Sequence, residues 1–366
     1  MNALNKKNYN NLASKDNIDI LDYKASFVSN NEIALLDHAG NVKDKITGNK
    51  IVINTGAQAN IPKIEGIKTT KNIYDSTGLL NINFQPKDLV IVGGGYIALE
   101  FASMFSNLGT QVTILERGDV IMPREDREVA DLALQDLQDK GISVHTNVET
   151  TAFSNEGDST IVHTNHGKFK ADAVLLATGR KPNTDGLGLE NTDVKMGQRG
   201  EVQVNSQLQT SVKHIYAAGD VKGGLQFTYI SLDDFRILRS QLFGDGSRTT
   251  ENRGNIPYTV FIDPPLSRVG LTAAEAEAQG FNFLENKIYV NTIPRHKIIN
   301  DSRGIFKVVL NKDNGEILGA SLYGKESEEL INFIKLAIDQ LIPYTVLSEN
   351  IYTHPTMAES FNDLFL

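Results

Sequence analysis

A glycine-rich turn between an apolar run and an amphipathic segment most constrains the fold of this chain. Residues 88–92 form a run, apolar after Asp88, of the kind found in a parallel strand buried on both faces. The turn Gly93-Gly94-Gly95 follows, and residues 96–108 carry apolar side chains at helical spacing. Gly93-x-Gly95-x-x-Ala98 between strand and helix predicts a dinucleotide-binding βαβ unit. We expect Gly93 to make the tight turn, Gly95 to admit a pyrophosphate and Ala98 to allow close packing of helix and strand.

The residues after this turn bear on the choice of dinucleotide. The predicted helix offers free N–H groups and the positive end of its dipole to the phosphates. Glu116 ends the next predicted strand, where a carboxylate accepts a bond from the ribose 2′-OH and repels a 2′-phosphate. Glu116 therefore favours NAD over NADP. Arg117 follows it and could tolerate the extra phosphate, so the choice stays open at this point.

Three other predicted strands also end in small residues. They are followed by Asn54-Thr55-Gly56, Ala177-Thr178-Gly179 and Ala218-Gly219-Asp220. A glycine at the carboxyl end of a strand lets a cofactor pass over the backbone, where open α/β sheets bind ligands. The alternative for each is a simple turn. Asp220 could accept hydrogen bonds from two sugar hydroxyls.

The order of elements predicts an α/β protein with a second kind of domain at its C-terminal end. Strands and helices alternate through residue 177, which indicates a right-handed parallel sheet of Rossmann type. From Ile256 the pattern changes to antiparallel strands, with Asn314-Gly315 as a hairpin turn. Residues 326–341 predict an amphipathic helix with Leu330, Phe333, Ile334, Ala337 and Ile338 facing inward.

Composition excludes several classes of function. The net charge of −9 argues against nucleic acid as a partner. No run approaches the ~20 apolar residues that span a bilayer, and residues 1–7 are too polar for a signal peptide, so we expect a cytoplasmic protein. There is no cysteine, which removes disulfides and thiolate ligands. Seven His and no Cys leave few ligands for zinc, so we predict no metal site.

Two histidines need separate interpretation. Glu359 follows His354 by five positions across a helix that we expect to begin at Pro355. A carboxylate fixes the tautomer of a neighbouring His and raises its basicity, as a general base requires. The alternative for His354 is a structural role. His296 could meet an anionic substrate, but we expect it in a solvated loop.

These motifs together resemble those of the class I pyridine nucleotide–disulfide oxidoreductases, a FAD-dependent family that includes dihydrolipoamide dehydrogenase, glutathione reductase and mercuric reductase. The resemblance runs from about Ile51 to the C-terminus. It is carried by VIVGGGYIALEFASMFSNLGTQVTILE (90–116), LLATGRKPN (175–183), IYAAGDV (215–221), TVFIDPPLSRVGLT (259–272) and HPTMAE (354–359). The C-terminal THPTMAESFNDLF is most similar to the hypothiocyanous acid and reactive-chlorine-resistance reductases, and it lacks the cysteine pair of mercuric reductases.

The resemblance implies an architecture and a set of site residues. Residues 1–84 would be part of a FAD-binding domain, 85–183 an inserted NAD(P)-binding domain, 184–253 the return of the FAD domain, and 254–366 a dimerisation domain. Tyr96 would cover the flavin until nicotinamide displaces it, and His354 and Glu359 would be an acid–base pair that reaches the partner subunit of a homodimer, with His354-Pro355 in cis. The implied cofactors are NAD(P)H and FAD, held by Gly93, Gly94, Gly95, Tyr96, Ile97, Ala98, Leu99, Glu100, Glu116 and Gly179, and by Thr55, Gly56 and Asp220.

The sequence also departs from this family. The N-terminal glycine-rich turn for the FAD pyrophosphate and the Cys-x4-Cys helix have no counterpart here, so we expect at least one βαβ unit to be missing. The lysine that pairs with Glu100 in the family is missing with it. A buried Glu100 without that partner should tend to be protonated.

Three functions remain in competition. The first is an oxidoreductase that passes hydride from NAD(P)H to FAD and on to an oxidised sulfur substrate, with its relay cysteines absent from this chain. The second is a non-catalytic fragment that binds nucleotide and dimerises. The third is a flavin NADH oxidase that needs no thiol. Flavin absorbance, NADH binding and oxygen uptake separate them.

Overall fold

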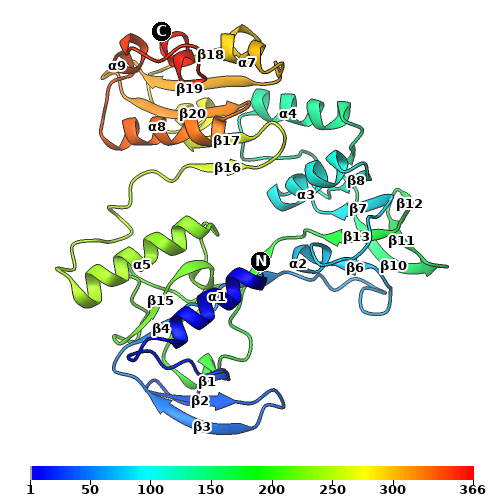
Figure 1. Ribbon diagram of the computed structural model, residues 1–366, viewed down its shortest axis with the longest axis vertical. Coiled ribbons are helices and arrows are strands. Elements are labelled where there is room, and N and C mark those ends of the chain that lie inside the picture. The colour runs from blue at the N-terminus through cyan, green and yellow to red at the C-terminus, as the bar shows by residue number, and fades with distance from the viewer. Residues whose placement is uncertain (1) are drawn as a thin grey trace. The chain divides into compact units, whose positions relative to one another are not determined.

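The computed structural model describes residues 2–366 and separates them into two compact units (Figure 1). One unit combines the chain up to Gln58 with Lys181–Asn252, and the other combines Ala59–Arg180 with Arg253–Leu366. The chain passes between the units at two short strands, β5 (Ala57–Ala59) and β14 (Arg180–Pro182), and again after Asn252.

A five-stranded parallel sheet carries the glycine turn. Its strands lie in the order β6-β13-β7-β8-β9, and each neighbouring pair is parallel. Their bounds are β6 (Ile73–Tyr74), β7 (Asp88–Val92), β8 (Gln111–Leu115), β9 (Ser143–His145) and β13 (Ala173–Leu176). The helices α3 (Tyr96–Asn107) and α4 (Arg127–Asp139) connect β7 to β8 and β8 to β9, whereas β13 lies on the other side of β7. Strand order therefore reverses between β7 and β13, which is where open α/β sheets bind ligands.

The apolar run of β7 is explained by cover on both faces of the sheet. Leu89 and Ile91 pack in one cluster with Ala98 of α3. Val90 and Val92 pack in another cluster with side chains of an antiparallel meander. The meander consists of β10 (Thr150–Glu156), β11 (Ser159–Thr164) and β12 (Gly167–Ala171), and the short helix α2 (Ser76–Leu79) follows β6. A strand enclosed in this way has no solvated face on which polar residues would be favoured.

The C-terminal part of the same unit is an antiparallel sheet with helices. Its strand order is β16-β17-β20-β19-β18, from β16 (Tyr258–Val260), β17 (Leu266–Gly270), β18 (Phe283–Tyr289), β19 (Ile305–Asn311) and β20 (Ile317–Tyr323). The helices are α6 (Ala273–Ala278), α7 (Pro294–Ile298), α8 (Ser327–Asp339), α9 (Tyr344–Glu349) and α10 (Phe361–Leu364). α8 contacts β17 and β20, and α4 contacts β20 (Figure 1). The hairpin predicted at Asn314-Gly315 joins β19 to β20.

Two side chains of this part differ from the sequence-based expectation. Phe333, predicted to face inward, is 57% exposed, while Leu330 and Ile334 are buried. The sheet covers only one face of α8, so the flank of its apolar stripe stays outside. His296, predicted in a solvated loop, lies in α7 and is fully buried. Its ring packs edge-on against Phe306 and its Nδ1 lies 2.8 Å from the Asp301 carbonyl oxygen.

The other unit contains two small sheets. β1 (Lys24–Phe27), β2 (Glu32–Leu36) and β3 (Val42–Thr47) form an antiparallel meander. β4 (Ile51–Ile53) pairs in parallel with β15 (Ile215–Ala217), and both contribute to one apolar core. Two α-helices, α1 (Asn2–Ala13) and α5 (Thr228–Phe243), also belong to this unit.

Candidate functional site

The three glycines after β7 are required for different reasons. Gly93 has φ +107°, a conformation that side-chain-bearing residues rarely adopt. A Cβ atom on Gly94 would lie 2.6 Å from Cδ1 of Ile121 and 3.1 Å from Cβ of Glu116. A Cβ atom on Gly95 would meet no atom within 4 Å. Gly93 and Gly94 are thus needed by the fold, whereas Gly95 faces open space of the kind a phosphate group needs.

The first turn of α3 faces that space with uncapped backbone groups. Gly95 is the N-cap residue and provides no side-chain hydrogen bond to the helix. The N–H groups at the start of a helix have no partner within the helix, and they attract anions. Ala98 and Leu99 are fully buried in the core, so their side chains hold α3 against the sheet. Ile97 is partly buried.

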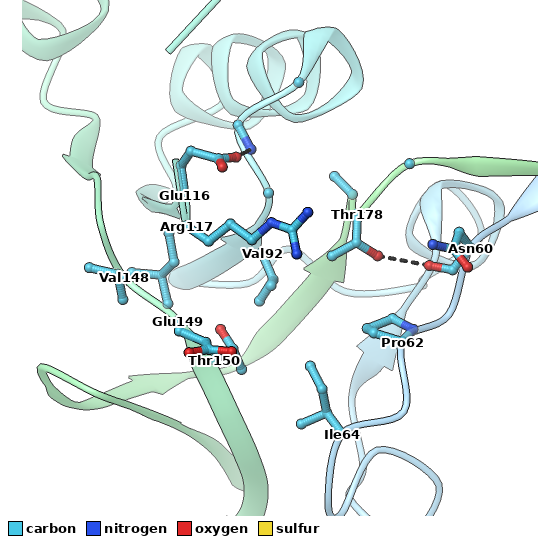
Figure 2. Close-up of a pocket in the computed structure, with 16 residues that line it drawn as sticks. Asn60, Pro62, Ile64, Val92, Glu116, Arg117, Val148, Glu149, Thr150 and Thr178 are labelled. Carbon is cyan, nitrogen blue, oxygen red and sulfur yellow. Dashed lines mark hydrogen bonds between the residues drawn. The ribbon is translucent and has the colours of Figure 1, made fainter. Parts of the chain in front are cut away.

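Glu116, at the end of β8, is fixed by two backbone N–H groups. Gly94 donates to Oε2 and Gly118 donates to Oε1, both at 2.6 Å. Figure 2 shows the bond to Gly94 and the neighbouring Arg117, whose guanidinium reaches into the cavity. The carboxylate is therefore held in one orientation beside the glycine turn, with the exposed cation Arg117 as its neighbour.

A cavity of about 520 Å³ connects these groups, within the range of small-molecule sites. Its walls include the glycine turn, Glu116, Arg117, Thr150 and Gly179. Gly179 follows β13 with φ +101°, and a Cβ atom there would also meet nothing within 4 Å. Asn60 lines the cavity next to Gly179. Its N–H donates to the Gly179 carbonyl at 2.9 Å, and its carbonyl accepts a hydrogen bond from Thr178 Oγ1 at 2.7 Å (Figure 2). The structure thus places Gly93, Gly94, Gly95, Glu116 and Gly179 around one cavity.

Tyr96 is held by Glu125, a residue that the sequence motifs do not identify. Its hydroxyl donates to Oε1 of Glu125, and the hydroxyl of Tyr258 donates to the same oxygen at 2.6 Å. Burial and then the nearby Glu125 charge raise the pKa of Tyr96 to about 12. Glu125 precedes the N-cap of α4 in a stretch without a recognisable motif, so no local signal identifies it.

Glu100 is partly buried on α3. One of its oxygens accepts a hydrogen bond from the Phe261 N–H at 2.9 Å. Burial raises the pKa of Glu100, and the bond from Phe261 only partly opposes that shift. The direction of this pKa shift is the one expected for a buried Glu100.

Thr55, Gly56 and Asp220 belong to the unit built from the N-terminal segment and Lys181–Asn252. Thr55 Oγ1 donates to the Asn183 carbonyl at 2.8 Å, and the Asn183 N–H donates to the Gly56 carbonyl at 2.9 Å. Asp220 follows β15 in a short 3-10 helix, Gly219–Lys222. Both segments start at the carboxyl ends of the parallel strands β4 and β15, a position suited to a nucleotide or flavin.

His354 and Glu359 form a pair near the C-terminus. Their Nδ1 and Oε2 atoms lie 2.6 Å apart, and Oε1 of Glu359 accepts a bond from the Thr356 N–H at 3.2 Å. The His354 side chain is 67% exposed. The His354-Pro355 bond is cis, as expected. No helix begins at Pro355, however, because a bend and the 3-10 turn Ala358–Ser360 bring the two side chains together instead.

Two further findings concern residues 2–366 as a whole. They contain no cluster of three or more His, Asp or Glu side chains that could hold a metal ion. They also contain no helix that is long and apolar enough to cross a membrane.

Comparison with known proteins assigns the class. Residues 2–234 match the pyridine nucleotide-disulphide oxidoreductase family, and residues 256–365 match its dimerisation domain. The chain therefore belongs to the pyridine nucleotide-disulphide oxidoreductases, as its motifs predicted. The predicted fold class, with a nucleotide-binding part and a C-terminal dimerisation domain, is confirmed.

Individual relatives refine this picture. The chain is 46% identical over 365 residues to "Probable pyridine nucleotide-disulfide oxidoreductase RclA" of Escherichia coli (strain K12), a match that covers 100% of this chain and 82% of the relative. The structure titled "HOCl-induced flavoprotein disulfide reductase RclA from Escherichia coli" superposes with a TM-score of 0.95 over 100% of this chain and 82% of that one, at 46% identity. A dihydrolipoyl dehydrogenase of Geobacillus stearothermophilus is 32% identical over 95% of this chain and 74% of its own length. The family and these relatives are FAD-dependent, with NAD(P)H as electron donor, in agreement with the expected cofactors.

Proposed function

We propose that the cavity beside Gly93–Gly95 binds NADH, and that the chain takes part in hydride transfer from NADH to FAD. The main support for this proposal is the open space at Gly95, beside the uncapped start of α3. A dinucleotide phosphate would accept hydrogen bonds from that first turn. In this proposal residues 85–183 are the dinucleotide domain and residues 254–366 form the homodimer.

The proposed preference for NADH over NADPH rests on Glu116. Its carboxylate is tied to the Gly94 and Gly118 N–H groups, so it cannot turn away from a 2′-phosphate without losing both bonds. A ribose 2′-OH would instead donate to it. Arg117 also lines the cavity, but its side chain is exposed, and we expect the fixed carboxylate to dominate the preference.

The flavin, when bound, supplies the acceptor of the hydride, and this chain's own residues orient it. The Asp220 carboxylate would accept hydrogen bonds from flavin chain hydroxyls, and the Gly56 backbone would let the cofactor approach closely. Glu100 would hold a proton on α3, because burial raises its pKa. His354, oriented by Glu359, would hold or move a proton for the partner subunit's site.

We propose that this polypeptide does not carry out the final step, in which electrons pass from the flavin through two thiols to an oxidised sulfur substrate. The 366 residues contain no cysteine, and a disulfide relay requires two thiols. The relatives carry names that refer to disulfides, but this chain should not reduce a disulfide by itself. An oxidised sulfur compound remains the proposed substrate class for a relay that includes the two thiols.

A second candidate is supported by the location of the cavity. All its walls lie in the unit of Ala59–Arg180 and Arg253–Leu366, so NADH binding needs nothing from the other unit. The chain could then act as a nucleotide-binding, dimerising protein without bound flavin.

Two measurements on the purified 366-residue protein test these proposals. Calorimetry should show NADH binding, and an absorbance scan should show whether flavin bands accompany the protein. Bound flavin together with NADH-dependent bleaching supports the oxidoreductase, whereas NADH binding to a colourless protein supports the second candidate. A protein that does not bind NADH contradicts both, and turnover of a disulfide contradicts the proposed loss of the sulfur step.

A further inference from the structure

One buried carboxylate spans the turn that carries Asp220. The turn is the 3-10 helix Gly219–Lys222 after β15, and Asp234 contacts it from α5. Oδ2 of Asp234 accepts a hydrogen bond from the Gly219 N–H at 2.8 Å, and the same oxygen lies 3.3 Å from Nζ of Lys222. Asp234 therefore holds the turn on both sides of Asp220, at the residue before it and at the second residue after it.

These contacts of Asp234 are shielded from solvent. The Asp234 side chain has no exposed surface, and that of Lys222 is 10% exposed. Hydrogen bonds and ion pairs are stronger in such surroundings than in water, because the local dielectric constant is lower. Water cannot easily replace the carboxylate there as a partner of the Gly219 N–H. The two contacts thus restrain the turn more than exposed contacts would.

Gly219 cannot be made rigid by a larger side chain, so the start of the turn depends on contacts with its neighbours. Its φ is +71°, a conformation that glycine adopts readily but does not hold by itself. A Cβ atom on Gly219 would lie 2.9 Å from Oδ1 of Asn54 and 3.0 Å from Oγ of Ser231. The bond from the Gly219 N–H to Asp234 therefore restrains a residue that has to remain glycine.

The later part of the turn is anchored in a different way. Val221 is fully buried in the apolar core of this unit, and the Gly223 N–H donates to the Asp220 carbonyl at 3.0 Å. Asp220 itself is only partly buried, so part of its surface is open to a ligand. A carboxylate that accepts bonds from two sugar hydroxyls has to keep one orientation, because hydrogen bonds weaken steeply when their geometry is lost.

We propose that Asp234 is a positioning residue for flavin binding, which holds the turn Gly219–Lys222 so that Asp220 presents its carboxylate to the hydroxyl groups of the FAD chain. The inference rests on the proposed role of Asp220. Asp234 is buried in the protein and acts on the flavin only through Asp220.

The first test measures the Kd for FAD by quenching of flavin fluorescence. Asp234→Leu with Lys222→Met replaces the ion pair by apolar side chains, so that no buried charge is left alone. This variant should raise the Kd about tenfold, because the start of the turn is released. Asp234→Asn with Lys222→Met keeps an acceptor for the Gly219 N–H and should bind FAD within about threefold of the unmodified protein. The comparison of Leu with Asn therefore isolates the bond to Gly219.

A control and a double-mutant cycle separate positioning from general damage to the fold. The control is Asp233→Asn, at the neighbouring position of α5, where Oδ1 accepts a bond from Arg248 at 2.7 Å. It should leave the Kd for FAD unchanged. In an Asp220→Asn background, adding Asp234→Leu with Lys222→Met should change the Kd less than about twofold. An equal loss with and without the Asp220 carboxylate would show that Asp234 acts on the fold alone and would overturn the inference.

Hydrogen exchange tests the hold on the turn without any flavin. In the free protein, mass spectrometry of a peptide that contains Gly219 should show exchange at least about tenfold faster in the Leu variant than in the Asn variant. Equal exchange in the two variants would contradict the inference. FAD binding that is equal in both variants also overturns it and leaves the proposed function intact. Failure of FAD to bind the unmodified protein refutes the proposed flavin role of Asp220, and the role of Asp234 is refuted with it.

Discussion

Gly93 lies so close to Ala177 that the space between β7 and β13 cannot take a side chain. A Cβ atom on Gly93 would lie 2.5 Å from the Ala177 carbonyl oxygen, a separation that real structures do not show. The two residues follow the carboxyl ends of the adjacent parallel strands β7 and β13. Both also line the cavity, so their close contact forms part of its wall.

Substitutions of Gly93 and Gly95 should have opposite consequences. Gly93→Ala should lower the free energy of unfolding by ~2–4 kcal/mol, because the residue has a positive φ and would clash with backbone. Gly95→Ala, in extended backbone with open space around it, should leave stability within ~0.5 kcal/mol. It should nevertheless weaken NADH binding about tenfold or more, since a methyl group would occupy the phosphate position. Thermal unfolding and calorimetry on both variants check this, and unimpaired NADH binding by Gly95→Ala would contradict the assigned phosphate position.

Glu116→Gln should reduce the preference for NADH over NADPH. The unmodified protein should bind NADH at least about tenfold more tightly than NADPH, because the 2′-phosphate of NADPH would lie beside a fixed negative charge. A neutral amide removes that repulsion and can accept only one of the bonds now made by the Gly94 and Gly118 N–H groups. Competition binding with the two dinucleotides measures the ratio. Arg117→Gln is the control, and it should increase the preference for NADH because it removes a cation of the cavity wall that could favour a phosphate. An equal ratio in all three proteins would remove Glu116 from the specificity argument.

Because of Lys307, the free energy of unfolding should fall as the pH rises in the alkaline range. It is 6% exposed on β19 and bonds Asp126, Glu128 and Glu285 at 2.9–3.1 Å. Burial alone would lower its pKa, but the bonds to Asp126 and the other carboxylates outweigh burial and raise the pKa to about 12 from 10.5. Because the folded-state pKa is the higher one, this stabilisation is complete below about pH 10.5 and is lost as the pH rises towards 12.

The matching variant is Lys307→Met, which leaves the three carboxylates without their cation. We expect a loss of about 2 kcal/mol, less than for a fully buried pair because Glu128 and Glu285 are partly solvated. Denaturant unfolding between neutral and alkaline pH should show the slope in the unmodified protein and a weaker one in the variant. Lys45→Met, which removes an exposed partner of Glu32, should change neither the free energy of unfolding nor its dependence on pH.

Phe333→Glu should weaken the proposed homodimer. Phe333 and Leu336 are 57% and 55% exposed on α8 within the dimerisation domain, and apolar side chains exposed in this way are typical of an association surface. A carboxylate buried in such a contact would lack a partner and oppose association. Light scattering over a concentration series should show more monomer than in the unmodified protein. Phe281→Glu, at a less exposed site before β18, is the control, and a dimer resistant to Phe333→Glu would place the interface elsewhere.

The sequence by itself determined the features that depend on neighbours along the chain. The strand at Asp88–Val92, the glycine turn and α3 follow from local periodicity and from the conformations open to glycine, and β7 has the predicted bounds. The pairing of His354 with Glu359 was also foreseeable, because only a short turn separates them. The helix expected from Pro355 was wrong, since the cis bond and the turn at Ala358–Ser360 make the contact in another way.

Only the tertiary structure decided which side chains from distant segments meet. Glu125 and Tyr258 are 133 positions apart, and nothing in either local pattern indicates the bond between them. The burial of His296 and Lys307 and the exposure of Phe333 were likewise hidden, because polar or apolar character does not say which face a neighbouring sheet will cover. Local sequence sets backbone conformation through short-range sterics, but burial and electrostatic pairing arise from contacts that exist only once the sheets and helices have packed.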